Sequence, residues 1–134
     1  MTRIFVGSSV EGRPYAQMVA NILHSSGAEP LLWWDAECFP VGKTLIESLP
    51  RLLDIADGAL IVATPDDETT RRGETYYTPA ANLLLEYGLF AGRLGTSRVA
   101  IVLVDRPRLA SDLAGIVHIE LPPHARRRRG PIGV

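Results

Sequence analysis

Short apolar segments that resemble buried strands alternate with helical patterns along nearly the whole chain. The strand-like segments are Ile4–Val6, Pro30–Trp34, Ala59–Ala63, Val99–Val104 and Gly115–Leu121, and the helical patterns between them cover Gly12–Ser25, Lys43–Ile55 and Ala80–Leu94. Strands that are apolar throughout, rather than at alternate positions, are buried on both faces, which is typical of a parallel sheet with helices on either side. The sequence therefore predicts an α/β fold, a flavodoxin-like three-layer sandwich around a five-stranded parallel sheet.

The size and charge of the chain favour one domain with a small ligand. Its 134 residues, 46% of them hydrophobic, can bury a real core, and 14 basic residues against 15 acidic ones give no general electrostatic reason to bind nucleic acid or a membrane. We expect one domain over residues 1–121 and an arginine-rich, disordered tail or linker over residues 122–134.

Cysteine and histidine usage argues against disulfides and metal ions. Cys38 is the only cysteine, and the three histidines are scattered without the spacing of metal ligands. The N-terminus lacks the apolar stretch of a secretory signal, and the helix predicted at Ala80–Leu94 is too short to span a bilayer. These features predict a cytoplasmic protein with no metal ion.

Polar residues follow the predicted strands at the edge of the sheet where ligands bind in such folds. They are Gly7, Ser8 and Ser9 after the first strand, Asp35 after the second, Thr64–Asp67 after the third and Asp105 after the fourth. The connection from Pro65 to Pro79 is long for a loop in a compact domain, so we expect it to cover the site.

Glu86 stands in the middle of the most apolar predicted helix, without a basic residue three or four positions away. Removing an unpaired carboxylate from water costs several kcal/mol, on the order of the stability of a small domain. Glu86 should therefore reach a cleft, where it would be a catalytic candidate, or accept bonds from backbone amides as a buried structural carboxylate.

Residues at key positions exclude two familiar phosphate chemistries. Gly42-Lys43-Thr44 resembles the end of a P-loop, but Glu37 stands where the first glycine is required. A phospho-acceptor receiver domain needs acidic residues where Gly7, Ser8 and Ser9 stand. Trp34, at the end of a predicted strand, is placed either to stack on a ligand ring or to pack in the core.

Several segments together resemble the bacterial TIR-like domain of cyclic-nucleotide-activated antiphage effectors. They include Ile4–Ser9, Phe39–Gly42, Thr64–Asp67 and Ser111–Gly115, and the most specific is Asn82–Gly95. The resemblance covers nearly all of residues 2–121 and implies a TIR-type fold and cleavage of NAD.

The resemblance also implies site residues and partners. The catalytic glutamate of the family falls on Glu86, and its substrate-pocket positions fall on Phe5, Gly7, Ser8, Ser9, Trp34, Asp67 and Asp112. NAD is then a substrate, and no cofactor is expected. The segment Asp35–Thr44 resembles the loop through which TIR domains stack into homo-oligomers, and a cyclic-nucleotide-sensing domain would be fused to this one.

A lone carboxylate suits this reaction because nicotinamide in NAD is already cationic and leaves as a neutral molecule without an acid. An ionised Glu86 would stabilise the oxocarbenium-like ribose. Two rival hypotheses stay open at this point. One is a nucleoside deoxyribosyltransferase, and the other is a catalytically silent TIR-like module that only assembles.

Overall fold

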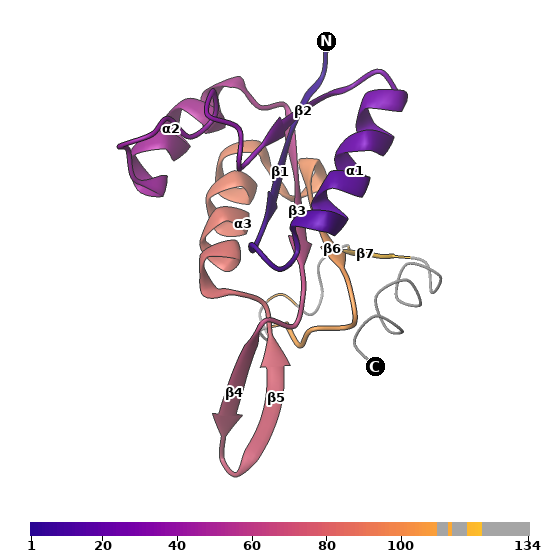
Figure 1. Cartoon of the computed structure of the whole chain (residues 1–134), viewed down its shortest axis with the longest axis vertical. Helices are drawn as coiled ribbons and strands as arrows, with labels where there is room; N and C mark the ends of the chain where they lie inside the picture. Colours follow the sequence, from indigo (N-terminus) through magenta and orange to yellow (C-terminus); the bar gives the residue numbers. More distant parts are fainter. Residues whose placement is uncertain (110–112, 114–117, 122–134) are drawn as a thin grey trace.

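The computed structural model describes residues 1–109, 113 and 118–121, and its centre is a five-stranded parallel sheet (Figure 1). The strand order is β2-β1-β3-β6-β7, the flavodoxin-like winding that the sequence predicts. The strands are β1 (Arg3–Ser8), β2 (Glu29–Leu32), β3 (Gly58–Ala63), β6 (Val99–Leu103) and β7 (His118–Glu120). The predicted fold class is confirmed.

Helices lie on both faces of the sheet. They are α1 (Arg13–Ser25), α2 (Leu45–Ile55) and α3 (Ala81–Leu94), and a short 3-10 turn, η1 (Thr96–Arg98), leads from α3 into β6. Figure 1 shows α1 on one side of the strands and α3, with α2 beyond it, on the other. Each helix begins within two residues of the pattern that predicts it.

Alternate side chains of the three central strands, β1, β3 and β6, fill two separate cores. Phe5, Ile61 and Ile101 belong to the core on the α3 side, whereas Val6, Val62 and Val102 belong to the core on the α1 side. All six are almost fully buried. Burial on both faces is the reason that these strands are apolar without alternation.

The connection between β3 and α3 differs from the expected covering loop, because most of it is a β-hairpin. Strand β4 (Asp67–Arg71) pairs antiparallel with β5 (Glu74–Thr78) around a two-residue turn, Arg72–Gly73. This hairpin extends away from the main sheet in Figure 1. Both turn residues have positive φ, 52° for Arg72 and 77° for Gly73, as the tightest hairpin turns require.

The segment between β2 and α2 contains both tryptophans and the predicted stacking loop. Strand β2 ends at Leu32, so Trp33 and Trp34 lie in a turn rather than in the predicted strand. Helix α2 then begins with a capping box. The Thr44 hydroxyl accepts from the Glu47 amide at 3.1 Å, and the Glu47 carboxylate accepts from the Thr44 amide at 3.0 Å.

Candidate active site

Glu86 is buried between α3 and the sheet. Helix α3 turns Leu83, Glu86, Tyr87 and Phe90 inward, at the spacing of one helical face, and leaves Glu86 with only 3% of its surface exposed. The carboxylate therefore does not reach a cleft in this conformation, in contrast to the first of the two alternatives considered above.

The carboxylate lies against the end of β1, at Gly7. A Cβ atom built on Gly7 would lie 2.7 Å from Oε1 of Glu86 and 2.9 Å from Cε2 of Phe5. Both distances are shorter than non-bonded atoms tolerate, so only glycine leaves room for the carboxylate here. Sequence reasoning names Glu86, Gly7 and Phe5 as site residues but does not predict this contact, which joins distant parts of the chain.

Burial without a partner determines the ionisation of Glu86. Among the residues that the structure describes, none donates a hydrogen bond to the buried Oε1 atom. Loss of water around the charged form raises the pKa of Glu86 from 4.5 to about 7. The backbone amides of the structural alternative do not reach Oε1. A cationic ligand beside this buried carboxylate would stabilise its ionised form.

Aromatic rings pack beside Gly7 and connect it to the Asp35–Thr44 segment. The rings of Phe5 and Phe90 stack with centroids 4.8 Å apart, and Phe39 meets the edge of Phe5 at 6.1 Å. The Trp33 indole also donates a hydrogen bond to the Ser8 hydroxyl at 2.7 Å. The segment is therefore anchored on β1 next to the position that Glu86 faces.

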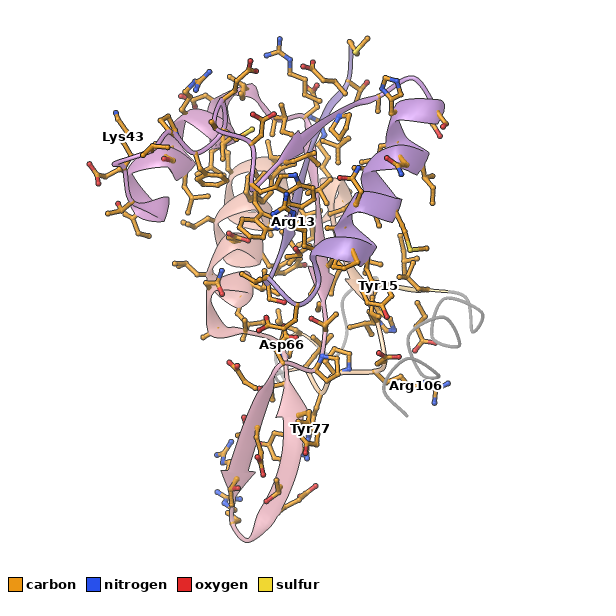
Figure 2. The ribbon with its side chains drawn as sticks, viewed as in Figure 1. Arg13, Tyr15, Lys43, Asp66, Tyr77 and Arg106 are labelled. Carbon is orange, nitrogen blue, oxygen red and sulfur yellow. The ribbon has the colours of Figure 1, made fainter. Side chains whose placement is uncertain are left out.

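Ser9, the first residue after β1, takes part in a hydroxyl network at the edge of the sheet. Ser9 Oγ accepts from the Gly12 amide at 3.1 Å and lies 3.2 Å from Thr64 Oγ1, which in turn donates to the Asp66 carboxylate at 2.7 Å. Figure 2 shows Asp66 where the hairpin meets the sheet. The network holds the ends of β1 and β3 together, and sequence reasoning missed the part of the fully buried Thr64.

The structure separates Trp34 from Glu86. Trp34 packs with the core on the α1 side of the sheet, and the guanidinium of Arg13 covers its ring at 4.7 Å. Glu86 lies on the α3 side, where its neighbour Phe5 belongs to the other core. In this conformation Trp34 is half-buried, and the Arg13 guanidinium covers one face of its ring. The last predicted site residue, Asp112, lies outside the described residues.

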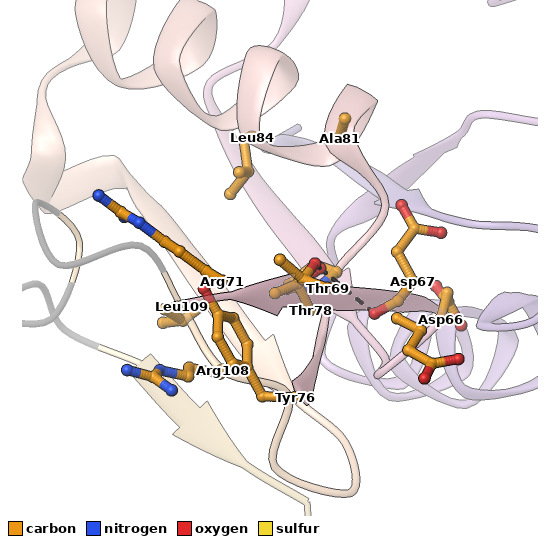
Figure 3. Close-up of a pocket in the computed structure, with 12 residues that line it drawn as sticks. Asp66, Asp67, Thr69, Arg71, Tyr76, Thr78, Ala81, Leu84, Arg108 and Leu109 are labelled. Atoms are coloured by element: carbon orange, nitrogen blue, oxygen red, sulfur yellow. Dashed lines mark hydrogen bonds between the residues drawn. The ribbon is translucent and has the colours of Figure 1, made fainter. Parts of the chain in front are cut away.

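Asp67 lies apart from Glu86, in a cleft of about 910 Å³ between the hairpin and the start of α3 (Figure 3). Carboxylates of Asp66, Asp67 and Glu68 line this cleft together with the arginines Arg71 and Arg108. Glu86 is not among its lining residues. Of the predicted pocket residues, Gly7 and Phe5 therefore lie beside Glu86, Trp34 packs on the other side of the sheet, and Asp67 lines a separate cleft.

The described residues contain neither a group of three metal-ligating side chains nor a helix that is long and apolar enough to cross a membrane. The arrangement offers one buried carboxylate, beside a glycine backbone and a stacked aromatic pair, to a ligand that carries positive charge.

Comparisons with known proteins give a consistent result. Residues 3–122 match the family model described as "CAP12/Pycsar effector protein, TIR domain". The chain is 37% identical over 115 residues to CD-NTase-associated protein 12 of Flavobacterium daejeonense, and 37% identical over 120 residues to the Pycsar effector protein PaPycTIR of Pseudomonas aeruginosa. These alignments cover 86% and 88% of the chain but only 36% and 39% of the relatives, so the chain spans less than half of their length.

Proposed function

Because the chain belongs to the CAP12/Pycsar effector family of TIR domains, we propose that it cleaves NAD into nicotinamide and ADP-ribose or a cyclic form of it. The observation that supports this most is the carboxylate of Glu86, buried against Gly7 without a hydrogen bond to Oε1 from any described residue. A carboxyl group buried in this way has a raised pKa, and a nearby cation would stabilise its charged form. Carboxylates at functional sites often have this property.

In the proposed reaction the bond between the ribose C1′ and the nicotinamide nitrogen breaks, and its electron pair leaves with nicotinamide. Positive charge then develops on the ribose, where an ionised Glu86 stabilises it. Water, or a nucleophilic atom of the adenine ring, completes the reaction at C1′, and the proton that this nucleophile loses goes to solvent. The cationic substrate lowers the pKa of Glu86 in the complex, which favours the ionised form that the reaction needs.

Access to Glu86 requires a movement, because only 3% of its surface is exposed. The Asp35–Thr44 segment contacts Phe5 through Phe39, so its displacement would uncover this side of the site. The same segment carries Val41, an apolar side chain that is 96% exposed. We assign this segment to contact with another copy of the domain, so that assembly of a homo-oligomer and opening of the site would occur together.

The wider role follows from the relatives. We assign the chain to the effector arm of a cyclic-nucleotide-signalling antiphage system in the bacterial cytoplasm, since it belongs to the CAP12/Pycsar effector family and its relatives include a Pycsar effector protein. The additional length of these relatives leaves room for a sensing domain. That domain would drive assembly, and the arginine-rich residues 126–129 would belong to the connection with it.

Glu86→Gln tests the activity directly. The variant keeps the shape of the side chain but carries no charge, so nicotinamide release from NAD at high protein concentration should fall at least about a hundredfold. Glu29→Gln, a matched change on β2, should leave the rate unchanged. Undiminished release by Glu86→Gln would refute the proposal.

Two further measurements distinguish the rival functions. Exchange of bases between a deoxynucleoside and a free base, without loss of NAD, would identify a deoxyribosyltransferase. Assembly without NAD cleavage, even when oligomers are forced by a fused oligomeric scaffold, would identify a silent module.

A further inference from the structure

The β4–β5 hairpin has one covered edge and one open edge. At the outer edge of β5 the Arg108 amide donates to the Tyr77 carbonyl at 2.8 Å, the Arg108 guanidinium bonds Glu74 at 2.8 Å, and it lies 4.1 Å from the centre of the Tyr76 ring. Within the described part of the chain, no strand or loop pairs with the outer edge of β4. Figure 1 shows the hairpin extending clear of the main sheet.

The pairing of the hairpin shows which backbone groups of β4 face outward. The Tyr77 carbonyl is used outside the hairpin, so Tyr77 and its partner Glu68 form a pair that does not exchange backbone hydrogen bonds. The amide and carbonyl of Glu68 therefore point away from β5. Because this orientation repeats every second residue, those of Thr70 also point outward. An open strand edge of this kind is a template for another strand.

Two opposite charges flank the middle of this edge. Asp67 and Arg71 lie on the same face of β4, two residues on either side of Thr69. The cross-strand partner of Arg71 is Glu74, which is bonded to Arg108 instead. Among the described residues, the side chains of Asp67 and Arg71 have neither a hydrogen bond nor an ion pair with another side chain.

We propose that β4 pairs antiparallel with β4 of a second copy of this chain, about a two-fold axis through Thr69. In this register Asp67 lies opposite Arg71 of the second copy, and Arg71 lies opposite its Asp67. Glu68 and Thr70 lie opposite Thr70 and Glu68 of the second copy, with all their outward amides and carbonyls paired. The surface is therefore self-complementary in both hydrogen bonds and charge, as a two-fold interface requires.

Other registers of the β4–β4 pairing would form less favourable contacts. An axis through Glu68 would place Glu68 opposite its own copy, with like charges in contact. An axis through Thr70 would bring Arg72 into the ladder, although Arg72 belongs to the turn and has a positive φ. The Thr69 register also places both ion pairs at positions without backbone hydrogen bonds, where side chains across two strands lie closest.

Charge reversal tests the register. Asp67→Arg and Arg71→Asp, each alone, place like charges opposite each other and should weaken the dimer of the 134-residue chain about tenfold or more in sedimentation equilibrium. The double variant restores both pairs and should return the dissociation constant to within about threefold of the starting value. Arg98→Asp, in η1 and outside the hairpin, should change little.

Three outcomes would overturn the proposal. They are a chain that stays monomeric up to about 1 mM, single reversals without effect, and a double variant as weak as the single ones. The range up to about 1 mM suits an interface this small, since small interfaces bind weakly.

Proline substitution tests the edge independently. Thr70 and Thr75 lie opposite each other, and their hydroxyls are 3.0 Å apart. The backbone amides of both residues point out of the hairpin. Proline at either position therefore removes one outward amide donor, and it also removes the hydroxyl contact between the two threonines. Thr70→Pro should abolish the dimer, whereas Thr75→Pro should keep it. Circular dichroism confirms that both variants fold, and equal dimerisation by the two would refute β4 pairing.

Discussion

At the scale of single residues, the ionisation of Glu86 links stability to pH. Its pKa is about 7 in the folded chain and near 4.5 when exposed, so the folded state favours the protonated form. This contribution to the free energy of unfolding is fully present below pH 4.5 and is lost as pH rises through 7. The loss amounts to about 3 kcal/mol, since one pKa unit corresponds to about 1.4 kcal/mol.

Glu86→Gln should therefore be the more stable protein at pH 8, with an advantage that shrinks by about 3 kcal/mol toward pH 4. Urea denaturation of both proteins at several pH values measures this difference, and other titrating groups cancel in the comparison. A difference that is independent of pH would show that Glu86 is not desolvated in the folded chain.

Gly7 is the other residue on which the arrangement depends. Gly7→Ala should destabilise the chain by about 1–3 kcal/mol, because the added methyl group meets the Glu86 carboxylate and the Phe5 ring. Gly88→Ala on α3 is the matched control, since nothing lies within 4 Å of its added atom and alanine favours a helix. Thermal unfolding should move the two melting temperatures in opposite directions, and equal shifts would contradict the contact.

At the scale of the elements, the hairpin turn is strained at Arg72. A side chain at φ 52° is disfavoured except for glycine, asparagine and aspartate. Arg72→Asn should stabilise the hairpin by about 0.5–1 kcal/mol, because asparagine before glycine suits this turn. Hydrogen exchange should slow at the hairpin amides but not in β1 or β3. Gly73→Ala should have the opposite effect, and unchanged exchange in both variants would argue against the turn geometry.

The elements also show what the sequence alone reveals. Strands such as Ala59–Ala63 are apolar at every position because both faces are buried, so their number, direction and winding are predictable. The hairpin cannot be predicted in this way, because β4 is polar at each position and its turn is Arg-Gly rather than Asn-Gly. Trp34 lies in a turn directly after a strand, and only tertiary packing decides on which face of the sheet its ring lies.

Only the part of the candidate site that depends on spacing along one helix can be predicted from the sequence. Helical spacing shows that no basic residue lies one turn from Glu86, and none of the described residues donates a hydrogen bond to its Oε1 atom. The full burial of the carboxylate and its contact with Gly7 depend on how α3 packs across the sheet, which spacing along one helix does not encode. Catalysis by Glu86, and the substrate contacts of Ser8, Ser9, Asp67 and Asp112, stay predictions.

At the scale of the whole molecule, the proposed function and the burial of Glu86 together predict that one copy alone cleaves NAD slowly. Nicotinamide release should rise faster than linearly with protein concentration, because contact through the Asp35–Thr44 segment would expose the site. Initial rates over a hundredfold range of concentration measure this. Val41→Asp should lower the rate at high concentration without changing the unfolding curve. Strictly linear rates would show that each copy works independently.

The chain also contains its own optical reporter. Its only two tryptophans, Trp33 and Trp34, are adjacent, and each is held by a different contact, one at the Ser8 hydroxyl and the other beneath the Arg13 guanidinium. Indole emission depends on hydrogen bonding and on nearby charge, so displacement of the turn changes the colour and intensity of the fluorescence. Opening of the fold at the end of β1 can thus be followed in real time in the unlabelled protein.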